Sequence, residues 1–387
     1  MIALNEPVVV GNEIRFIKDA IKKNWISSFG NYNKQFDKFL SKITKSKNVI
    51  SVSSGTAALH LALRVLGVDK NQEVIVPSLT FVASVNVIKY LNSNPIFMDV
   101  DYDHNLNIDK TIDFLEKKTF FKNNFTYNRK TKKKIRVLIV THMWGNALDF
   151  YKLRKVCKKR NIFIVEDAAE ALGTYYSYGK LKKQHVGTIG DLGCLSFNGN
   201  KIITTGSGGA ILTNKKKLAK KILYLSQQAK DDPIRYTHNE VGYNYRLSNL
   251  NAAFGCGQIT KLNKYILNKK KNYLFYSSYI NKISGLKMLA PKNYSESNYW
   301  MNVLIIDKSI IKKTPYDFYK RLLVKGIETR LIWKPNHLQK MYKKNEKYRV
   351  ILSEEIFNTC LCIPSSANLN KSKLKTICKA IKEIAIN

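Results

Sequence analysis

The 387-residue sequence contains few acidic residues, no cysteine framework and no long apolar run, and each shortage excludes a class of protein. Its six cysteines include no Cys-x-x-Cys pair and no histidine at zinc-finger spacing, which argues against a zinc module or a disulfide scaffold. The apolar stretches are far shorter than the ~20 residues of a membrane span. The first ten residues lack the basic and apolar regions of a signal peptide. We therefore expect a soluble cytoplasmic protein with no metal and no membrane partner.

Acidic residues number only 28 against 66 Lys and Arg residues, which gives a formal net charge of +38. Such a balance fits a polyanionic partner, for example nucleic acid, a membrane surface or a phosphorylated substrate. The lysines are scattered along the chain rather than gathered in a stripe. Compositional drift is therefore the favoured explanation, and no nucleic-acid partner is expected. A phosphorylated substrate would need only a local basic pocket.

The first half of the chain alternates short apolar runs with helical patterns. Apolar residues make up 44% of the sequence, and its length predicts about two domains. The expected strands cover residues 49–53, 73–76, 95–100, 137–140 and 162–166, and the expected helices cover 56–66, 81–91 and 149–160. This alternation predicts an α/β fold with a buried, mostly parallel sheet and helices on both faces. Ligands bind such sheets at the carboxyl ends of the strands.

Helical periodicity dominates after residue 213. We expect helices at 216–229 and 248–280, followed by a second α/β unit with a strand at 300–306, a helix at 315–325 and a strand at 327–333. The last helix would bury one face made of Leu374, Ile377, Ile381 and Ile384. We expect a large domain at 1–260 and a smaller C-terminal α/β domain at 261–387.

The lysine-rich segment 117–136 interrupts the pattern of the first half. Basic residues with interleaved aromatics suit single-stranded nucleic acid. A solvated hairpin or a subunit-contact arm is the favoured interpretation.

Three sequence features stand where a parallel sheet would bind a ligand. An apolar strand ends at Asp167, and a lone Lys201 lies among Ser, Asn and Gly residues. The Walker spacing is absent because Ile202 follows this lysine, which argues against a P-loop. Residues 53–56 carry a strand directly into a helix, whose N-terminus forms an anion site. Taken singly, each has an ordinary explanation, as a capping aspartate, a hairpin lysine or an N-cap.

Together and in this order, the three features resemble fold-type-I pyridoxal-phosphate (PLP) enzymes. More narrowly, they resemble the sugar aminotransferases of the DegT/DnrJ/EryC/StrS family. The resemblance covers essentially the whole chain. The motifs that carry it are Gly11–Glu13, Pro77–Phe81, Glu166–Glu170, Gly199–Lys201, Gly242–Arg246 and Glu328–Arg330.

The resemblance implies a cofactor site for PLP. Lys201 would hold the aldehyde as a Schiff base, and its freed amine would shuttle a proton. Asp167 would keep the pyridine nitrogen protonated, so that the ring acts as an electron sink. The other expected cofactor contacts are Thr56, the N–H of Ala57 and Ser196 at the phosphate, Phe81 and Ala169 on the two ring faces, and Glu170 near the hydroxyl.

The resemblance also implies a site shared between two subunits of a homodimer. Asn244 or Arg246 would reach the phosphate or the substrate of the neighbouring subunit. On the substrate side, Arg330 could meet a diphosphate as a bidentate partner. Trp333 and His337 follow it, and Trp333 could equally pack in the core.

Some positions near the expected site stay open or depart from the family pattern. His142 follows a strand, so it could act in catalysis or make a structural hydrogen bond. Trp144 stands where many members carry Tyr, and Leu331 where Pro is common. These departures leave the substrate detail open.

The implied reaction is transamination at C4 of a nucleotide-linked 4-keto-6-deoxy sugar for cell-surface glycan synthesis, with L-glutamate as donor. Segments 199–205 and 228–232 and the basic insert resemble the legionaminic acid and bacillosamine branch. That branch implies a 2-acetamido-4-keto-2,6-dideoxyhexose on UDP or GDP. GDP-perosamine-type enzymes share the same motifs and are the alternative.

Two further alternatives depend on the proposed catalytic residues. A PLP-dependent sugar dehydratase of this family would carry His in place of Lys201. A non-catalytic binding protein on the same scaffold would have lost Lys201 or Asp167. Both residues are present, and they argue against these alternatives.

Overall fold

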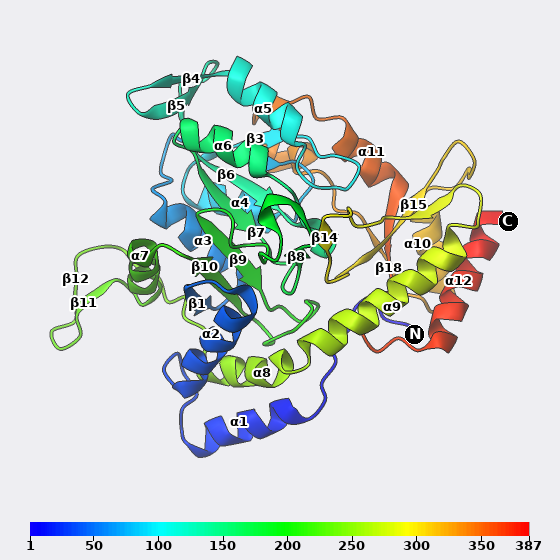
Figure 1. Ribbon diagram of the computed structural model, residues 1–387, viewed down its shortest axis with the longest axis horizontal. Helices are drawn as coiled ribbons and strands as arrows, with labels where there is room; N and C mark the ends of the chain where they lie inside the picture. Colours follow the sequence, from blue (N-terminus) through cyan, green and yellow to red (C-terminus); the bar gives the residue numbers. More distant parts are fainter. Residues whose placement is uncertain (387) are drawn as a thin grey trace.

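The computed structural model describes residues 1–386 and is built around a ten-stranded sheet (Figure 1). The main path runs β1–β10–β9–β7–β6–β2–β3–β17. Its strands are β1 (Asn48–Val52), β2 (Glu73–Pro77), β3 (Asn94–Met98), β6 (Lys134–Thr141), β7 (Phe163–Asp167), β9 (Leu192–Ser196), β10 (Gly209–Thr213) and β17 (Lys347–Tyr348). Along this path, every neighbouring pair of strands from β9 to β17 is parallel. Strand β10 is antiparallel to both of its neighbours, β1 and β9. The predicted mostly parallel sheet is confirmed.

Helices cover both faces of this sheet because its strands are apolar on both sides. Along β2, Val74 and Val76 pack into one core cluster and Ile75 into the other, as the two-residue repeat of a strand requires. One face is covered by α3 (Gly55–Val65), α4 (Ala83–Tyr90) and α7 (Lys216–Ser226). The other is covered by α2 (Asn31–Thr44), α5 (Ile108–Lys117), α6 (Tyr151–Lys159) and α8 (Asn249–Ile259).

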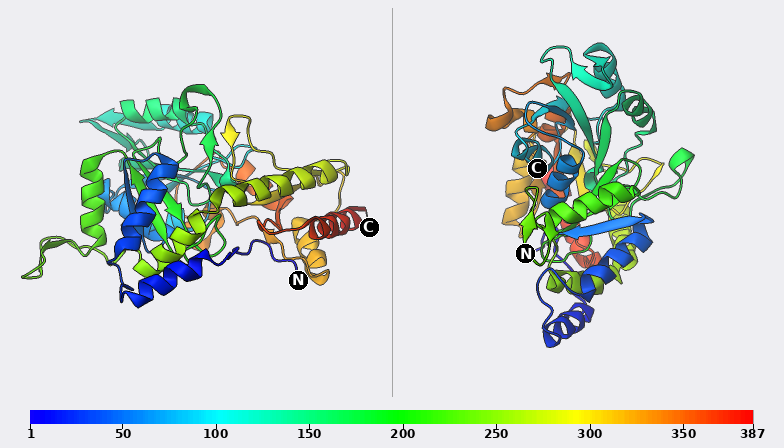
Figure 2. Two further views of the ribbon diagram at one scale, coloured as in Figure 1. Left: turned by 60° about the horizontal axis from the view of Figure 1, so that its bottom comes forward. Right: turned by 90° about the vertical axis from the view of Figure 1, so that its left-hand side faces the viewer.

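A second unit follows α8 and contains a four-stranded antiparallel sheet. Its strand order is β13 (Leu286–Met288), β15 (Asn302–Ile306), β18 (Cys360–Ile363) and β16 (Arg330–Leu331). The helices packed on it are α9 (Leu262–Ile280), α10 (Pro315–Val324) and α12 (Lys371–Ile386). Figures 1 and 2 show α9 running from α8 to this unit, with both chain termini at the same end of the molecule.

Two segments cross the predicted boundary between residues 260 and 261. Ile2 forms a bridge with Ile327 of the second unit, and β17 returns to pair with β3 of the large sheet. The chain therefore joins the two units at both ends, and the division into 1–260 and 261–387 stays a prediction.

The expected helix at 248–280 is two helices, α8 and α9, in the structure. The hydroxyl of Thr260 donates to the carbonyl of Gly257, and Lys261 has a non-helical φ of −108°. Such side-chain bonds to the backbone compete with the helical pattern. The expected strand at 327–333 shortens to the two residues of β16.

The lysine-rich insert forms the hairpin of β4 (Thr119–Lys122) and β5 (Phe125–Asn128), which pairs with β6. Asn123 and Asn124 both adopt positive φ, as a tight two-residue hairpin turn requires. Of the two favoured interpretations of this segment, the hairpin is therefore observed.

The remaining elements are short or peripheral. They are α1 (Asn12–Lys22), α11 (Leu352–Thr359), the ladder of β8 (Tyr175–Tyr176) with β14 (Ser295–Glu296), and the hairpin of β11 (Lys230–Asp232) with β12 (Thr237–His238). The β11–β12 hairpin projects away from the body of the molecule (Figures 1 and 2). No helix within residues 1–386 has the length and apolar character to cross a membrane.

Candidate active site

A cavity of about 350 Å³ lies where strand ends of the large sheet meet the second unit. Thr141, Asp167 and Ser196 come from the carboxyl ends of β6, β7 and β9, as the sheet topology predicts. The predicted site residues that line the cavity are Thr56, Phe81, Asp167, Ala169, Glu170, Ser196, Lys201, Arg330 and Trp333. The structure therefore brings residues from four of the six family motifs, together with Thr56, Ser196 and Trp333, to one site.

Asp167 is held at the cavity by two hydrogen bonds. The hydroxyl of Ser84, in the first turn of α4, donates to Oδ2 at 2.5 Å. The N–H of Ala169 donates to Oδ1 at 3.1 Å. Two donors on different oxygens fix the carboxylate plane at the end of β7.

Lys201 lies in the irregular segment between β9 and β10, and its side chain is 14% exposed. Its Nζ is 3.7 Å from Oε1 of Glu170 and 4.1 Å from the centroid of the Trp300 ring. A carboxylate and an indole face both attract an ammonium group. The lysine amine is therefore directed at the cavity while remaining largely shielded from solvent.

Glu170 is a buried carboxyl group beside this lysine. Burial raises the pKa of Glu170 to about 7, although the charge of Lys201 opposes the shift. The N–H of Trp144 donates to Oε2 of Glu170 at 2.8 Å. A carboxyl group that titrates near neutral pH can accept or release a proton there.

The start of α3 forms the anion-binding end of the cavity. Ser54 caps the helix by accepting the N–H of Ala57 at 3.0 Å, so the predicted Ala57 donor already has a partner. The N–H groups of Gly55 and Thr56 precede it, where a helix offers no intrahelical partner. A Cβ on Gly55 would lie 2.8 Å from Cβ of Ser196, so glycine permits this close approach. The helix start and the hydroxyls of Thr56 and Ser196 thus fit a phosphate group.

Aromatic side chains form part of the cavity wall. Phe81, 51% exposed, meets Trp333 edge-on at 5.3 Å between ring centroids. Trp333 lies 4.9 Å from Trp144, which stacks on Trp300 at 6.2 Å. Trp333 therefore both lines the cavity and packs on its neighbours.

Besides Ala57, three predicted residues lie outside the cavity lining. His337 is buried, with Nδ1 at Ser78 Oγ and Nε2 2.9 Å from Glu354. Arg246 donates to the carbonyl of Ser51 at 2.9 Å and lies 3.9 Å from Asp37. Asn244 is exposed beyond the β11–β12 hairpin. The predicted roles of Asn244 and Arg246 concern a neighbouring subunit, so those roles stay predictions.

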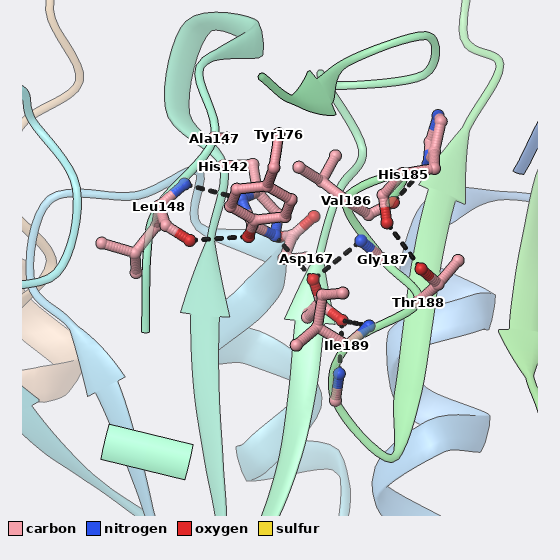
Figure 3. Close-up of polar contacts among 12 residues, drawn as sticks. His142, Ala147, Leu148, Asp167, Tyr176, His185, Val186, Gly187, Thr188 and Ile189 are labelled. Carbon is pink, nitrogen blue, oxygen red and sulfur yellow. Dashed lines mark hydrogen bonds and ion pairs between the residues drawn. The ribbon is translucent and has the colours of Figure 1, made fainter. Parts of the chain in front are cut away.

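His142 lines the cavity but belongs to a buried hydrogen-bond network (Figure 3). Its Nδ1 accepts the N–H of Leu148 at 3.1 Å, so Nε2 carries the proton and donates to Glu166 at 2.9 Å. Glu166 also accepts the N–H groups of Gly187, Ile189 and Gly190. These contacts favour the structural alternative for His142.

Sequence reasoning missed Ser84 and Trp300. Ser84 lies three residues beyond Phe81 in an expected helix, so helical spacing could have identified it. Trp300 begins an expected strand in a distant part of the chain, and no local pattern connects it with Lys201. Within residues 1–386, no group of three or more His, Cys, Asp or Glu side chains is arranged to hold a metal ion.

The fold and the site together are those of PLP-dependent transferases. A mostly parallel sheet brings a lysine, an aspartate and a helix N-terminus that can bind a phosphate to one end of its strands. Comparison with known proteins then identifies the family. Residues 8–382 match the DegT/DnrJ/EryC1/StrS aminotransferase family, and the chain belongs to it.

Two curated relatives and one solved structure are similar along nearly the whole chain. GDP-perosamine synthase of Escherichia coli O157:H7 is 33% identical, covering 99% of this chain and 98% of the relative. EpsN of Bacillus subtilis, named as a pyridoxal phosphate-dependent aminotransferase, is 32% identical, covering 96% and 92%. The aminotransferase TlmJ of Streptoalloteichus hindustanus has the same fold, with a TM-score of 0.87, 23% identity, and coverage of 99% and 98%. The protein is therefore a PLP-dependent sugar aminotransferase.

Proposed function

We propose that the protein transfers the amino group of L-glutamate to the C4 keto carbon of a nucleotide-linked 4-keto-6-deoxyhexose. The glutamate leaves as 2-oxoglutarate, and the keto oxygen of the sugar leaves as water. The product would serve cell-surface glycan synthesis in the cytoplasm. The observation that carries this proposal is the Lys201 amine in one cavity with the Asp167 carboxylate.

The residues of the cavity take distinct roles in this proposal. Bound PLP supplies an electron sink for the carbon that loses or gains the proton. Lys201 attaches the cofactor and, when free, carries the proton to and from that carbon. Asp167 would hold the proton on the pyridine nitrogen, and the hydrogen bonds from Ser84 and Ala169 keep its carboxylate oriented at the cavity. Thr56 and Ser196 hold the phosphate at the start of α3.

Glu170, Phe81 and Ala169 complete the proposed cofactor site. Phe81 and Ala169 would cover the two faces of the bound ring, and both line the cavity. Oε1 of Glu170 lies 3.7 Å from the Lys201 amine, within ion-pair distance.

The substrate side is proposed from one cation and an aromatic wall. Arg330 is exposed and lines the cavity, so its guanidinium can meet the diphosphate of a sugar nucleotide. Trp333 offers an apolar face to the deoxy sugar. His337 lies outside the cavity lining, and its contacts with Ser78 and Glu354 would support the substrate side indirectly.

Two sugars are candidates. Similarity to a GDP-perosamine synthase supports a GDP-perosamine-type 4-aminotransferase. The motifs at 199–205 and 228–232 support the 2-acetamido-4-keto-2,6-dideoxyhexose of the legionaminic acid and bacillosamine branch, on UDP or GDP. Each candidate leaves C4 as the acceptor carbon.

We propose a homodimer with shared active sites. Large apolar side chains are exposed along α1 and the loop after it, with Trp25 at 54% and Phe29 at 61%. Exposed apolar patches of this kind mark protein interfaces. The projecting β11–β12 hairpin has two more, Ile234 and Tyr236, and the chain then leads to Asn244 and Arg246. The exposed residues of α1 and its following loop would contact a second copy of the chain. The β11–β12 hairpin of one copy would then lie near the cavity of the other copy.

A substrate panel tests the proposal. Purified protein with PLP and glutamate is offered 4-keto-6-deoxy sugars on GDP and on UDP, with and without the 2-acetamido group. Mass spectrometry should find one amino sugar whose nitrogen comes from ¹⁵N-glutamate. Labelled product from none of the four sugars, despite turnover of glutamate, would contradict the proposed acceptor.

A further inference from the structure

Lys269 is a buried lysine in the middle of α9, outside the cavity lining. Lys269 is 2% exposed. Burial lowers the pKa of Lys269 to about 7, and no neighbouring charge counters this effect. Burying an ammonium group without a carboxylate is unfavourable, and an apolar residue would fill the position at lower cost. The position therefore calls for a reason other than packing.

Three oxygen atoms from separate chain segments surround the Lys269 amine. Nζ donates to Oδ1 of Asn5 at 3.0 Å, to the carbonyl of Trp300 at 3.2 Å and to the carbonyl of Ser365. Three acceptors match the three N–H donors of an ammonium group. Lys269 therefore joins the N-terminal segment, the segment that leads into β15 and the turn after β18.

Two of these partners lead directly to the active-site lysine. The side-chain amide of Asn5 donates to the carbonyl of Asn200 at 2.7 Å, and the indole N–H of Trp300 donates to the same carbonyl at 2.7 Å. Asn200 immediately precedes Lys201. The Trp300 ring also lies 4.1 Å from the Lys201 Nζ.

The backbone around Lys201 receives few other hydrogen bonds, although the Ile202 and Ile203 side chains pack in the core. It lies outside the regular strands, between the end of β9 and the start of β10. Its own N–H donates to the carbonyl of Asn198, which belongs to the same irregular segment. The carbonyl of Asn200 is therefore the point at which the second unit holds this segment.

We infer that Lys269 is a positioning residue: it fixes Asn5 and Trp300 so that both hold the Asn200 carbonyl and keep the Lys201 amine facing the cavity. The inference rests on the proposed role of Lys201 and adds a residue from the second unit to its support. It also explains why a charged residue is buried in α9.

The test compares Lys269→Met with Lys270→Met, a change at the exposed neighbour on the same helix. Hydrogen exchange by mass spectrometry follows the amides of residues 198–203 without added PLP. Loss of a hydrogen-bonded anchor should speed their exchange about tenfold in Lys269→Met and leave it unchanged in Lys270→Met. A titration with PLP should then give a dissociation constant about tenfold weaker for Lys269→Met only.

A second variant separates positioning from general stability. Asn5→Ala removes one link to Asn200 while keeping the lysine, so it should produce part of the same two effects. In the double variant Asn5→Ala/Lys269→Met, the Asn5→Ala change should speed exchange and weaken PLP binding by less than it does in the wild-type background, because both changes act through the Asn200 carbonyl. This variant also decides the matter if Lys269→Met does not fold.

Unchanged exchange at 198–203 in folded Lys269→Met, or in Asn5→Ala where Lys269→Met does not fold, would overturn the inference. Full additivity of the two changes would also overturn it. A wild-type protein that fails to bind PLP would instead contradict the proposed function, and the exchange measurement would still decide the role of Lys269.

Discussion

At the scale of single residues, the proposed electron-sink chemistry depends on the orientation of the Asp167 carboxylate. Its two oxygens accept from Ser84 and Ala169, and an asparagine at this position could keep one such bond but not the charge. Asp167→Asn should therefore retain PLP and lower the transamination rate by ~100-fold or more. Stopped-flow absorbance with glutamate measures this rate, and an unchanged rate would remove Asp167 from its assigned role.

Glu170 gives a pH dependence of stability whose sign follows from its raised pKa. The carboxyl group has a pKa of about 7 in the folded protein and an ordinary value of 4.5 when unfolded. The folded state therefore binds the extra proton, and this contribution is full below pH 4.5 and lost as the pH rises through 7. Between pH 5 and 8, cofactor-free wild type should lose on the order of 2 kcal/mol more unfolding free energy than Glu170→Gln.

Urea denaturation at the two pH values measures the difference for Glu170. Glutamine keeps an oxygen for the Trp144 N–H, so the comparison isolates the titrating proton. Equal pH dependence in wild type and Glu170→Gln would show that the carboxyl group does not titrate in this range.

Residues that follow predicted strands could be identified from sequence, because parallel strands bring their carboxyl ends to one edge. Asp167 is identified in this way, whereas Ser196 and Lys201 are identified by the resemblance of their motifs to the family, because the strand that precedes them is not predicted. Trp300 and Lys269 could not be, since their contacts with the Lys201 segment depend on how the second unit packs. His337, predicted on the substrate side, contacts Ser78 and Glu354 outside the cavity lining, and only the tertiary contacts reveal this position.

At the scale of elements, the start of α3 depends on a glycine. A Cβ on Gly55 would lie 2.8 Å from Cβ of Ser196, which is too close without a shift of β9 or of the helix. Gly55→Ala should therefore lower stability by about 1–3 kcal/mol and weaken PLP binding about tenfold. Thermal unfolding and a PLP titration measure the two effects, and an unchanged affinity would argue against a phosphate at this helix start.

Element boundaries followed the sequence where periodicity was strong and failed where local bonds intervened. The strands of the first half were predicted to within a few residues. The single helix expected at 248–280 ends instead at Ile259 and resumes at Leu262, because Thr260 bonds back to the chain. Strands β9 and β10, which flank Lys201, carry small residues and were not recognised as part of the sheet.

At the scale of the whole molecule, the apolar surface along α1 and its following loop predicts self-association. Trp25→Asp should shift the protein from dimer towards monomer in analytical ultracentrifugation, because it puts a charge into the proposed interface. Leu267→Asp, at an exposed position on α9, is the matched control and should leave the dimer intact. A wild-type protein that is monomeric at micromolar concentration would contradict the shared active site.

The central claim is that the Lys201 amine and the Asp167 carboxylate operate one PLP site, and the visible spectrum of the protein tests it most directly. Wild type saturated with PLP should show the yellow band of the bound cofactor. Addition of glutamate should convert that band to the amine form of the cofactor and release 2-oxoglutarate. Lys201→Ala should show neither the band nor the conversion. A conversion that persists in Lys201→Ala, or a wild-type protein without the band, would contradict the claim.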